Sequence, residues 1–439
     1  MTTTHLGSKL WVVLNSNRLV AELYGRKGSM TNGRPHYPMV GELISQNRRS
    51  VLLPQNGWTD RRRVMHQLLN GTALTRYQEY QDEESRQLMV NYLNDPQHWY
   101  LHNGTYSNTV IHRITFGQKP SASPEEMAEV TKAQFAFLMN APPYNFWDCF
   151  PELARLPNAV QFWRSKFAAM GRHTMEAYSA YWAPLRQSME KEDAAQSFAR
   201  DLVLDEAKFQ GSSTDKMFLA MQLIEAGSDT TRLGINIFIL AAISHPDKFQ
   251  KARDQIDSLC GGGDQKRLPK FWDEPDLPYI NAFAKEMLRW RRIFDWTPEH
   301  TLTEDLVFED YHFPKGTNFI INHVSIANDK TLYPNPQEFQ PERWLDGREA
   351  EIWNGSWQFG HGRRICVGYR LAQKSLFITL ARLIYCFDFQ PAAGTKLKQR
   401  GPFDNSSINH FATGEPFPVN VRVRGEEYAN LIMDSHRKQ

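Results

Sequence analysis

Apolar residues recur every three or four positions over most of this chain, and the pattern predicts a mainly helical protein. Prolines and short polar stretches separate the predicted helices. We expect helices at residues 15–24, 58–69, 77–93, 105–115, 125–140, 158–187, 214–244, 246–260, 279–291 and 371–387. Roughly thirty residues after the first of these, rich in Gly, Pro and Asn, are expected to form a long irregular loop.

Patterns typical of β-strands are few and short. Residues 10–14 read as one strand, and a β-rich stretch runs from 301 to 322, with strands at 306–308 and 318–322. No internal repeat, low-complexity segment or linker divides the 439 residues. The expected fold class is therefore mainly α with a small β region, in a single domain spanning residues 1–439.

Composition and charge exclude several classes of function. The chain has 51 Lys and Arg against 49 Asp and Glu, and a net charge of only +2 argues against a nucleic-acid partner. The longest apolar run, residues 237–243, is too short to cross a bilayer, and the N-terminus lacks the apolar core of a signal peptide. Four cysteines are too few and too scattered for a disulfide scaffold or a zinc ribbon, which fits a reducing compartment.

One cysteine, Cys366, lies in a motif rich in glycine and arginine, because residues 359–368 read Phe-Gly-His-Gly-Arg-Arg-Ile-Cys-Val-Gly. A thiolate needs positive potential, and here arginines precede the cysteine while a predicted helix starts behind it. The pattern predicts a thiolate that holds a haem iron. Phe359 would cover the sulfur side of the haem, and Arg364 would pair with a haem carboxylate. The glycines would allow turns and close approach of the backbone to a flat ligand.

The alternative for this motif is a structural cysteine at the start of a buried helix. Five positions are in register, which makes a chance match a weak explanation: Phe359, Gly362, Arg364, Cys366 and Gly368. The stretch resembles the haem-binding signature of the cytochrome P-450 monooxygenases. The resemblance implies the cytochrome P-450 fold, a triangular helical prism around a buried heme b whose iron is axially bound by the Cys366 thiolate.

The resemblance also implies partners. No flavin or nicotinamide fingerprint appears in the chain, so electrons from NADPH would come through a separate NADPH-cytochrome P-450 reductase. The implied substrates are dioxygen and an apolar small molecule. We expect an intracellular, cytoplasm-facing monomer without a transmembrane segment, with peripheral contact to the endoplasmic reticulum as an open alternative.

A second motif combines opposite charges. Glu286 and Arg289 stand three residues apart on a predicted helix, where they can pair, and such a pair alone is common on protein surfaces. It is followed by Tyr-Pro-Asn-Pro at 333–336 and Phe-Gln-Pro-Glu-Arg-Trp at 339–344, and the set resembles the family's buried Glu-Arg-Arg network. The resemblance implies that Glu286, Arg289 and Arg343 form a structural charge network beneath the haem pocket.

Residues 226–231, Ala-Gly-Ser-Asp-Thr-Thr, lie midway along a long apolar helix, where glycine and adjacent hydroxyl residues are poor helix formers. One explanation is a Gly–Thr kink with a solvent-facing Asp. The stretch also resembles the oxygen-binding helix centre of the family. The resemblance implies that Gly227 makes room for dioxygen, Thr230 donates a hydrogen bond to iron-bound peroxide, and Asp229 assists proton delivery.

Three further elements concern the haem edge. Trp58 and Arg62 resemble the family's Trp-x-x-x-Arg element, which implies a contact with a haem carboxylate. Arg61 and Arg63 point elsewhere around the same helix, either to solvent or as a basic patch that steers the acidic electron donor. His300 follows the charge-pair helix, where relatives place Arg or His against the second haem carboxylate; a solvated loop histidine is the alternative.

The resemblance implies that residues 294–296, Phe-Asp-Trp, look over the haem into the substrate pocket. Asp295 would receive a cationic or indole-like substrate, unless its carboxylate turns to solvent. Other variable segments expected to build the pocket are the stretch before Trp58 and residues 142–157 and 405–411.

The resemblance extends from about Lys9 to Arg424, and its wording is most similar to fungal secondary-metabolism members of the O-methylsterigmatocystin oxidoreductase type. Eukaryotic members usually begin with a membrane anchor, a proline-rich hinge and a first helix, whereas this chain starts at the first sheet. The protein would then be soluble or peripheral, or the sequence would lack an exon, and the sheet would lack its edge strand. Asn328–Asp329 stands where relatives often carry His or Arg before Asp, and no mechanism follows from it.

The predicted function is a haem-thiolate monooxygenase that inserts one oxygen atom into an apolar, polycyclic or alkaloid-like molecule, as a tailoring step in natural-product biosynthesis. An isomerase or dehydratase of the same fold that uses a substrate peroxide would not need Asp229 and Thr230. A non-catalytic haem sensor or degenerate scaffold is the other alternative, against which the intact residues of the motifs count: Cys366, Glu286, Arg289 and Thr230.

Overall fold

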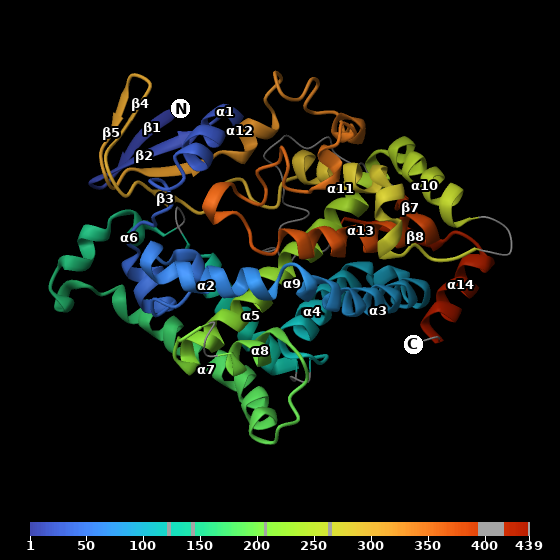
Figure 1. Ribbon diagram of the computed structural model, residues 1–439, viewed down its shortest axis with the longest axis horizontal. Helices are drawn as coiled ribbons and strands as arrows, with labels where there is room; N and C mark the ends of the chain where they lie inside the picture. Colours follow the sequence, from blue (N-terminus) through green and yellow to red (C-terminus); the bar gives the residue numbers. More distant parts are fainter. Residues whose placement is uncertain (121–123, 142–144, 206–208, 262–265, 394–416, 438–439) are drawn as a thin grey trace.

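The computed structural model of the protein describes residues 1–120, 124–141, 145–205, 209–261, 266–393 and 417–437. Helices dominate it, and strands β1 to β6 gather at one end of the molecule, near the N-terminus (Figure 1). The longer helices are α2 (Gln55–Leu68), α3 (Thr72–Asn94), α4 (Trp99–Phe116), α5 (Pro124–Leu138), α7 (Arg164–Glu190), α9 (Ser213–Ser244), α10 (Pro246–Cys260), α11 (Pro278–Trp290), α13 (Tyr369–Cys386) and α14 (Glu426–Arg437).

Shorter helical segments connect these helices. They are α1 (Asn17–Val20), α6 (Phe146–Cys149), α8 (Phe198–Leu204) and α12 (His323–Ala327), the π-helical turns η1 (Ala21–Arg26) and η2 (Pro38–Ile44), and the 3₁₀ turns η3 (Ser50–Leu52), η4 (Pro96–His98), η5 (Pro151–Arg155), η6 (Asn158–Val160), η8 (Phe271–Asp276), η9 (Pro341–Trp344), η10 (Arg348–Ala350) and η11 (Gly362–Arg364).

Every helix expected from the apolar pattern has a counterpart, although several begin or end a turn or more away from the predicted residue. The mainly helical fold class is therefore confirmed. Local signals explain the best match: α9 begins where Ser212 and Asp215 form a reciprocal capping box, and α10 begins at Pro246, which suits a first helical turn. Helices α8 and α14 were not expected.

The turns η2 and η3 interrupt the segment expected to be a long irregular loop, so that expectation is wrong at residues 38–44 and 50–52. Glycine and proline content suggested a loop, but apolar residues of η2 bury against α7 and hold the turn in place. This cluster contains Tyr37, Met39, Val40, Ile44, Trp163 and Phe167. Tertiary packing overrides the local composition here.

The main sheet has strand order β1-β2-β6-β3. Its strands are β1 (Thr2–Leu6), β2 (Lys9–Leu14), β3 (His300–Thr301) and β6 (Asn318–Ile321). The expected loss of the edge strand is wrong, because β1 pairs antiparallel with β2. The pattern missed β1 because its side chains are mostly exposed and show no apolar alternation. Two-stranded sheets join β4 (Leu306–Phe308) to β5 (Tyr311–Phe313) and β7 (Phe387–Pro391) to β8 (Val419–Val423).

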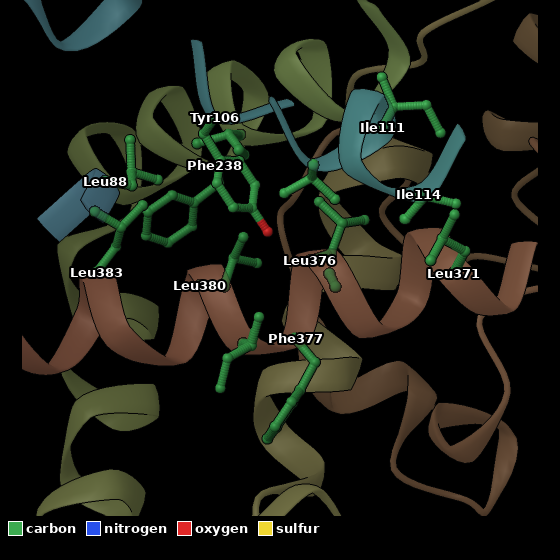
Figure 2. Packing of buried hydrophobic residues seen from close by; sticks show 14 of the residues in the cluster. Leu88, Tyr106, Ile111, Ile114, Phe238, Leu371, Leu376, Phe377, Leu380 and Leu383 are labelled. Carbon is green, nitrogen blue, oxygen red and sulfur yellow. The ribbon is translucent and has the colours of Figure 1, made fainter. Parts of the chain in front are cut away.

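Helix α9 runs through the helical part and is buried along most of its length. Figure 2 shows the packing between α4, α9 and α13, where Tyr106, Phe238 and Leu380 belong to one large buried cluster. Within the described ranges, none of the helices combines the length and the apolar character needed to span a bilayer. The core thus fixes α9 against the helix that follows the predicted haem loop.

Candidate functional site

The loop before α13 presents Cys366. The Cys366 backbone N–H donates to the carbonyl of Phe359 at 2.7 Å, which closes the loop into a tight turn. Gly360 and Gly362 adopt φ values of +74° and +67°, a conformation that favours glycine. A Cβ on Gly362 would lie 2.0 Å from the carbonyl oxygen of Tyr24. The close approach that requires this glycine is therefore to η1, and not to a ligand as the sequence suggested.

The Cys366 side chain is accessible, yet protein surrounds it closely enough that burial raises the pKa of its thiol. A side chain that is both accessible and desolvated faces a space inside the protein. The Gly368 backbone N–H and the charge of Arg62 partly oppose the burial effect. The expected positive environment is therefore present, but in the protein alone it is weaker than desolvation.

Arg364 is held beside this loop by two backbone carbonyls. Its Nε donates to Asn32 and its Nη2 to Leu53, both at 2.9 Å, and its guanidinium carbon lies 4.0 Å above the ring of Trp58. Its buried Nη1 has no hydrogen-bond partner in the described part of the chain. Burial, followed by the charges of Arg34 and Arg62, lowers the Arg364 pKa to about 8.

His300 lies in β3 and is buried, so it is not a solvated loop residue. Its ring stacks on that of Tyr24 with centroids 4.0 Å apart and planes 2° from parallel. Among the described residues, its buried Nδ1 has no partner. Burial holds the pKa of His300 well below its usual range, and the charges of Arg34 and Arg364 act in the same direction.

Arg62, His300 and Arg364 form a cluster that we call the anion seat. Arg62 Nη1 donates to the carbonyl of Ile365 at 2.6 Å, directly beside Cys366. Burial also lowers the Arg62 pKa, while the Cys366 thiol opposes this effect. Buried N–H groups without acceptors cost roughly 1–3 kcal/mol each. The seat is therefore built for anionic oxygen atoms, and its donors match carboxylates better than any neutral group.

Glu286, Arg289 and Arg343 meet in one buried network. The Glu286 carboxylate accepts from Arg289 Nη2 at 2.7 Å and Nε at 2.9 Å, and from Arg343 Nε at 3.2 Å. Trp344 Nε1 donates to the same carboxylate at 2.9 Å, a partner to which the sequence assigned no role. Arg289 also donates to the carbonyls of Ala327, Pro336 and Glu338. The network thus joins α11 to the segment that leads toward the haem loop.

The residues at the centre of α9 differ in what they contact. A Cβ on Gly227 would lie 2.6 Å from Cγ1 of Ile111, so this glycine lets α9 pack closely on α4 and does not leave free space for dioxygen. The neighbouring Ala226 is exposed although the turns beside it are buried. Thr230 donates its hydroxyl to the Ala226 carbonyl at 2.7 Å. Both Ala226 and Gly227 belong to the sequence motif, but only the structure shows that Ala226 is exposed while Gly227 packs against Ile111.

The Asp229 carboxylate is partly buried and has hydrogen-bond partners, so it is not a solvent-facing side chain. It accepts from Arg232 Nη2 at 2.9 Å and from Gln134 Nε2 at 3.0 Å, and Arg232 in turn donates to the Tyr100 hydroxyl at 2.8 Å. Helices α4 and α5 supply Tyr100 and Gln134, neither of which carries a sequence signal. Asp229 therefore lies in a polar chain that leads away from α9.

Two charged residues already have partners. Arg61, 14% exposed, donates to Asp215 at 2.8 Å and is therefore not free to steer a partner protein, whereas Arg63 remains 56% exposed beside Asp60. Asp295 accepts from the buried Arg292 at 3.2 Å, so its charge is compensated before any cationic substrate arrives. Of the other pocket segments expected from the sequence, residues 405–411 and 142–144 lie outside the described residues.

Comparison with known proteins identifies the class of protein that this fold and site define. A sequence model described as Cytochrome P-450 matches residues 1–409, which is most of the chain, and the chain belongs to the cytochrome P-450 family. It is a cytochrome P-450 monooxygenase. Family membership implies a haem–thiolate centre, and members generally receive electrons from a reductase partner.

Similar proteins include fungal enzymes. The cytochrome P-450 monooxygenase verL of Clonostachys rogersoniana is 30% identical, over 98% of this chain and 81% of its own length. The monooxygenase fogE of Aspergillus ruber is 28% identical, over 97% of this chain and 81% of its own length. A zebra fish cytochrome P-450 solved with abiraterone has the same fold, with a TM-score of 0.74 at 21% identity, covering 97% of this chain and 96% of that one.

Proposed function

We propose that this monooxygenase holds heme b through the Cys366 thiolate and inserts one oxygen atom into an apolar small molecule, as a tailoring step in natural-product biosynthesis. The anion seat carries the proposal. Its unpartnered buried nitrogens, Arg364 Nη1 and His300 Nδ1, lie near Arg62, which adjoins the accessible Cys366, as two haem carboxylates require. The haem would supply electron transfer and dioxygen activation, with electron donation from the thiolate.

The residues in and around the loop have separate roles in this proposal. Arg62, Arg364 and His300 bind the haem carboxylates, and Trp58 supports Arg364 by a cation–π contact. Phe359 packs partly buried against the core, where it would exclude water from the sulfur. The Gly368 backbone N–H donates to the thiolate and thereby stabilises its charge.

On α9 we propose that Thr230 donates a hydrogen bond to bound oxygen and that Asp229 relays the proton. The hydroxyl of Thr230 is now used by the Ala226 carbonyl, so donation to a ligand requires a rotation about χ1. Asp229 must exchange its bond to Arg232 or Gln134 before it can pass a proton inward. Gly227 contributes by holding α9 against α4.

The partners we propose follow the family. Electrons from NADPH would reach the haem through a separate NADPH-cytochrome P-450 reductase. The protein would act as one catalytic domain and as a monomer, on the cytoplasmic side, with dioxygen and an apolar molecule as substrates. The relatives named above are fungal enzymes, and a finer similarity to O-methylsterigmatocystin oxidoreductase-type members stays a prediction.

The reduced, carbon monoxide-bound spectrum of the purified protein tests the proposal. We expect a thiolate-ligated Soret band in the wild type and its loss in Cys366→Ala, because alanine offers no axial ligand. Cys260→Ala is the matched control, since this buried cysteine lies at the end of α10 and outside the loop. A wild-type spectrum without the thiolate band, or a band that survives in Cys366→Ala, would refute the proposal.

A further inference from the structure

The π-helical turn η1 lies between the first sheet and the haem loop. Two of its backbone positions contact that loop: the Tyr24 carbonyl sits where a Cβ of Gly362 would be, and a Cβ on Gly25 would lie 3.1 Å from Nε2 of His361. Turns of this kind are rare and occur often at functional sites. Turn η1 therefore packs directly against the predicted haem loop.

Tyr24 also fixes the imidazole of His300 from behind. Its ring stacks on the His300 ring at 4.0 Å, and its hydroxyl donates to the carbonyl of Phe319 at 2.8 Å. Phe319 is the residue that faces His300 across the pairing of β3 with β6. One tyrosine therefore binds both His300 and the strand partner of His300, which limits rotation of the imidazole ring.

The chemistry of Tyr24 suits a permanent contact. The side chain is buried, and burial raises the pKa of its hydroxyl, so it stays a neutral donor at any physiological pH. The backbone of Thr31 takes a hydrogen bond from the His300 ring, while Nδ1 has no partner within the described ranges. An unpartnered buried nitrogen keeps a useful direction only if the ring cannot turn.

We propose that Tyr24 is a positioning residue for the haem, because the stack of its ring on the imidazole directs His300 Nδ1 toward a haem carboxylate beside Arg364. The inference rests on the proposed function, in which His300 contacts that carboxylate. The simpler explanation is that Tyr24 only fills the small core cluster of the first sheet, to which it also belongs.

A double-mutant cycle on haem release separates the two explanations. The rate of haem transfer from the holoenzyme to an excess of a haem-binding acceptor protein is measured for Tyr24→Leu, His300→Ala and the double variant. We expect Tyr24→Leu to release haem about threefold to tenfold faster, the range of an aromatic stacking contact. In the His300→Ala background the same change should have almost no further effect.

Tyr24→Phe is the matched control, since it keeps the ring and removes only the hydroxyl; we expect haem release within about twofold of the wild type. Tyr24→Met preserves much of the buried volume and replaces Tyr24→Leu if that variant folds poorly. Resonance Raman spectra give a second readout, because the haem propionate bending band should shift in Tyr24→Leu and stay in place in Tyr24→Phe.

The outcomes distinguish this inference from the proposed function. Equal acceleration by Tyr24→Leu with and without His300 would overturn the positioning role and leave Tyr24 as core packing, while the thiolate spectrum of the wild type would stand. Unchanged haem release in His300→Ala would remove the contact on which the inference depends. Absence of the thiolate band in the wild type would overturn the proposed function itself.

Discussion

The hydrogen-bond partners of a buried carboxyl group decide whether it is charged or protonated. The Glu286 carboxylate is fully buried and is compensated by Arg289, Arg343 and Trp344 together. The Glu299 carboxyl is equally buried but receives a hydrogen bond from Tyr37, which is neutral. The first group is therefore a charged support, and the second favours its protonated form.

For Glu286→Ala we expect haem-poor and largely unfolded protein. The substitution leaves the buried Arg289 without a carboxylate, at a cost of about 3–5 kcal/mol, which is a large share of the stability of a typical protein. Haem content and far-ultraviolet circular dichroism of the purified variant are the measurements. Glu338→Ala is the control, since the network uses only the backbone carbonyl of this exposed residue. Normal haem content in Glu286→Ala would contradict the structural role.

Glu299 gives a pH-dependent prediction. Burial raises the pKa of its carboxyl to about 7 from the ordinary 4.5, while the hydrogen bond from Tyr37 and the charge of Arg34 oppose the shift. Between these values the folded protein keeps a proton that the unfolded chain releases, so this contribution is complete below about pH 4.5 and is lost as the pH rises through about 7. Asp148, whose pKa burial raises to about 6, acts in the same direction.

We therefore expect Glu299→Gln to gain stability over the wild type as the pH rises across this window, by an amount on the order of 3 kcal/mol. Urea unfolding at a series of pH values measures the difference between the two proteins. Glu304→Gln changes an exposed carboxylate of the same region and should follow the wild type. Parallel pH profiles for wild type and Glu299→Gln would show that Glu299 titrates normally.

At the scale of elements, the distance between α9 and α4 depends on one missing side chain. Gly227 faces Ile111, and an added Cβ would lie 2.6 Å from its Cγ1 and 2.7 Å from its Cδ1. These atoms belong to a buried and closely packed part of the core, which has little room to adjust. The glycine in the middle of α9 is therefore explained by helix packing.

Gly227→Ala should lower the unfolding free energy by about 1–3 kcal/mol through overpacking, although alanine is the better helix former. Ile111→Val, which removes a methyl group from the contact, should restore part of the loss in the double variant. Gly57→Ala in α2 is the control, because its Cβ would meet only ordinary contacts at 3.7 Å and should be neutral or slightly stabilising. Thermal unfolding of the wild type and these four variants decides, and additive effects of Gly227→Ala and Ile111→Val would contradict the packing explanation.

At the scale of the whole molecule, the anion seat couples haem binding to folding. Three distant segments supply its residues: Arg62 from α2, His300 from β3 and Arg364 from η11. The unpartnered Arg364 Nη1 destabilises the haem-free fold, and any anion that accepts from it stabilises that fold by mass action. Haem removal should therefore leave a less stable protein that responds to small anions.

We expect inorganic phosphate to raise the melting temperature of the haem-free protein more than that of the holoenzyme. At ten times the dissociation constant of phosphate, the free energy of unfolding of the haem-free protein should rise by about 1.4 kcal/mol more. The holoenzyme corrects for the general effect of phosphate on protein surfaces. Arg364→Met should abolish the difference, whereas Arg363→Met, at the exposed neighbouring position, should keep it. An equal response of haem-free and loaded protein would exclude the anion seat.

The features that the sequence predicted are set by residues close together in the chain, and most of those it missed are contacts between distant residues. Apolar periodicity and capping signals act over a few residues, and they were sufficient to predict α9, α10 and α13. The spacing of Glu286 and Arg289 and the motif around Cys366 are likewise local, and the structure joins each to its expected neighbours. Local patterns could not predict the partner of Arg61, because Asp215 lies 154 residues away in the chain, whereas Arg292 lies three residues from Asp295 and was within reach of a local pattern.

The sequence by itself therefore determined the helical class and the pairing of Glu286 with Arg289, because these depend on spacing along the chain. The resemblance of its motifs implied the role of the Cys366 loop and the place of Arg343 in the charge network. The tertiary structure alone decided that Gly227 serves packing and that Tyr24 stacks on His300. Each of these depends on contacts between residues far apart in the chain. Such contacts are selected by the burial and the hydrogen bonding of the whole fold, which no local pattern records.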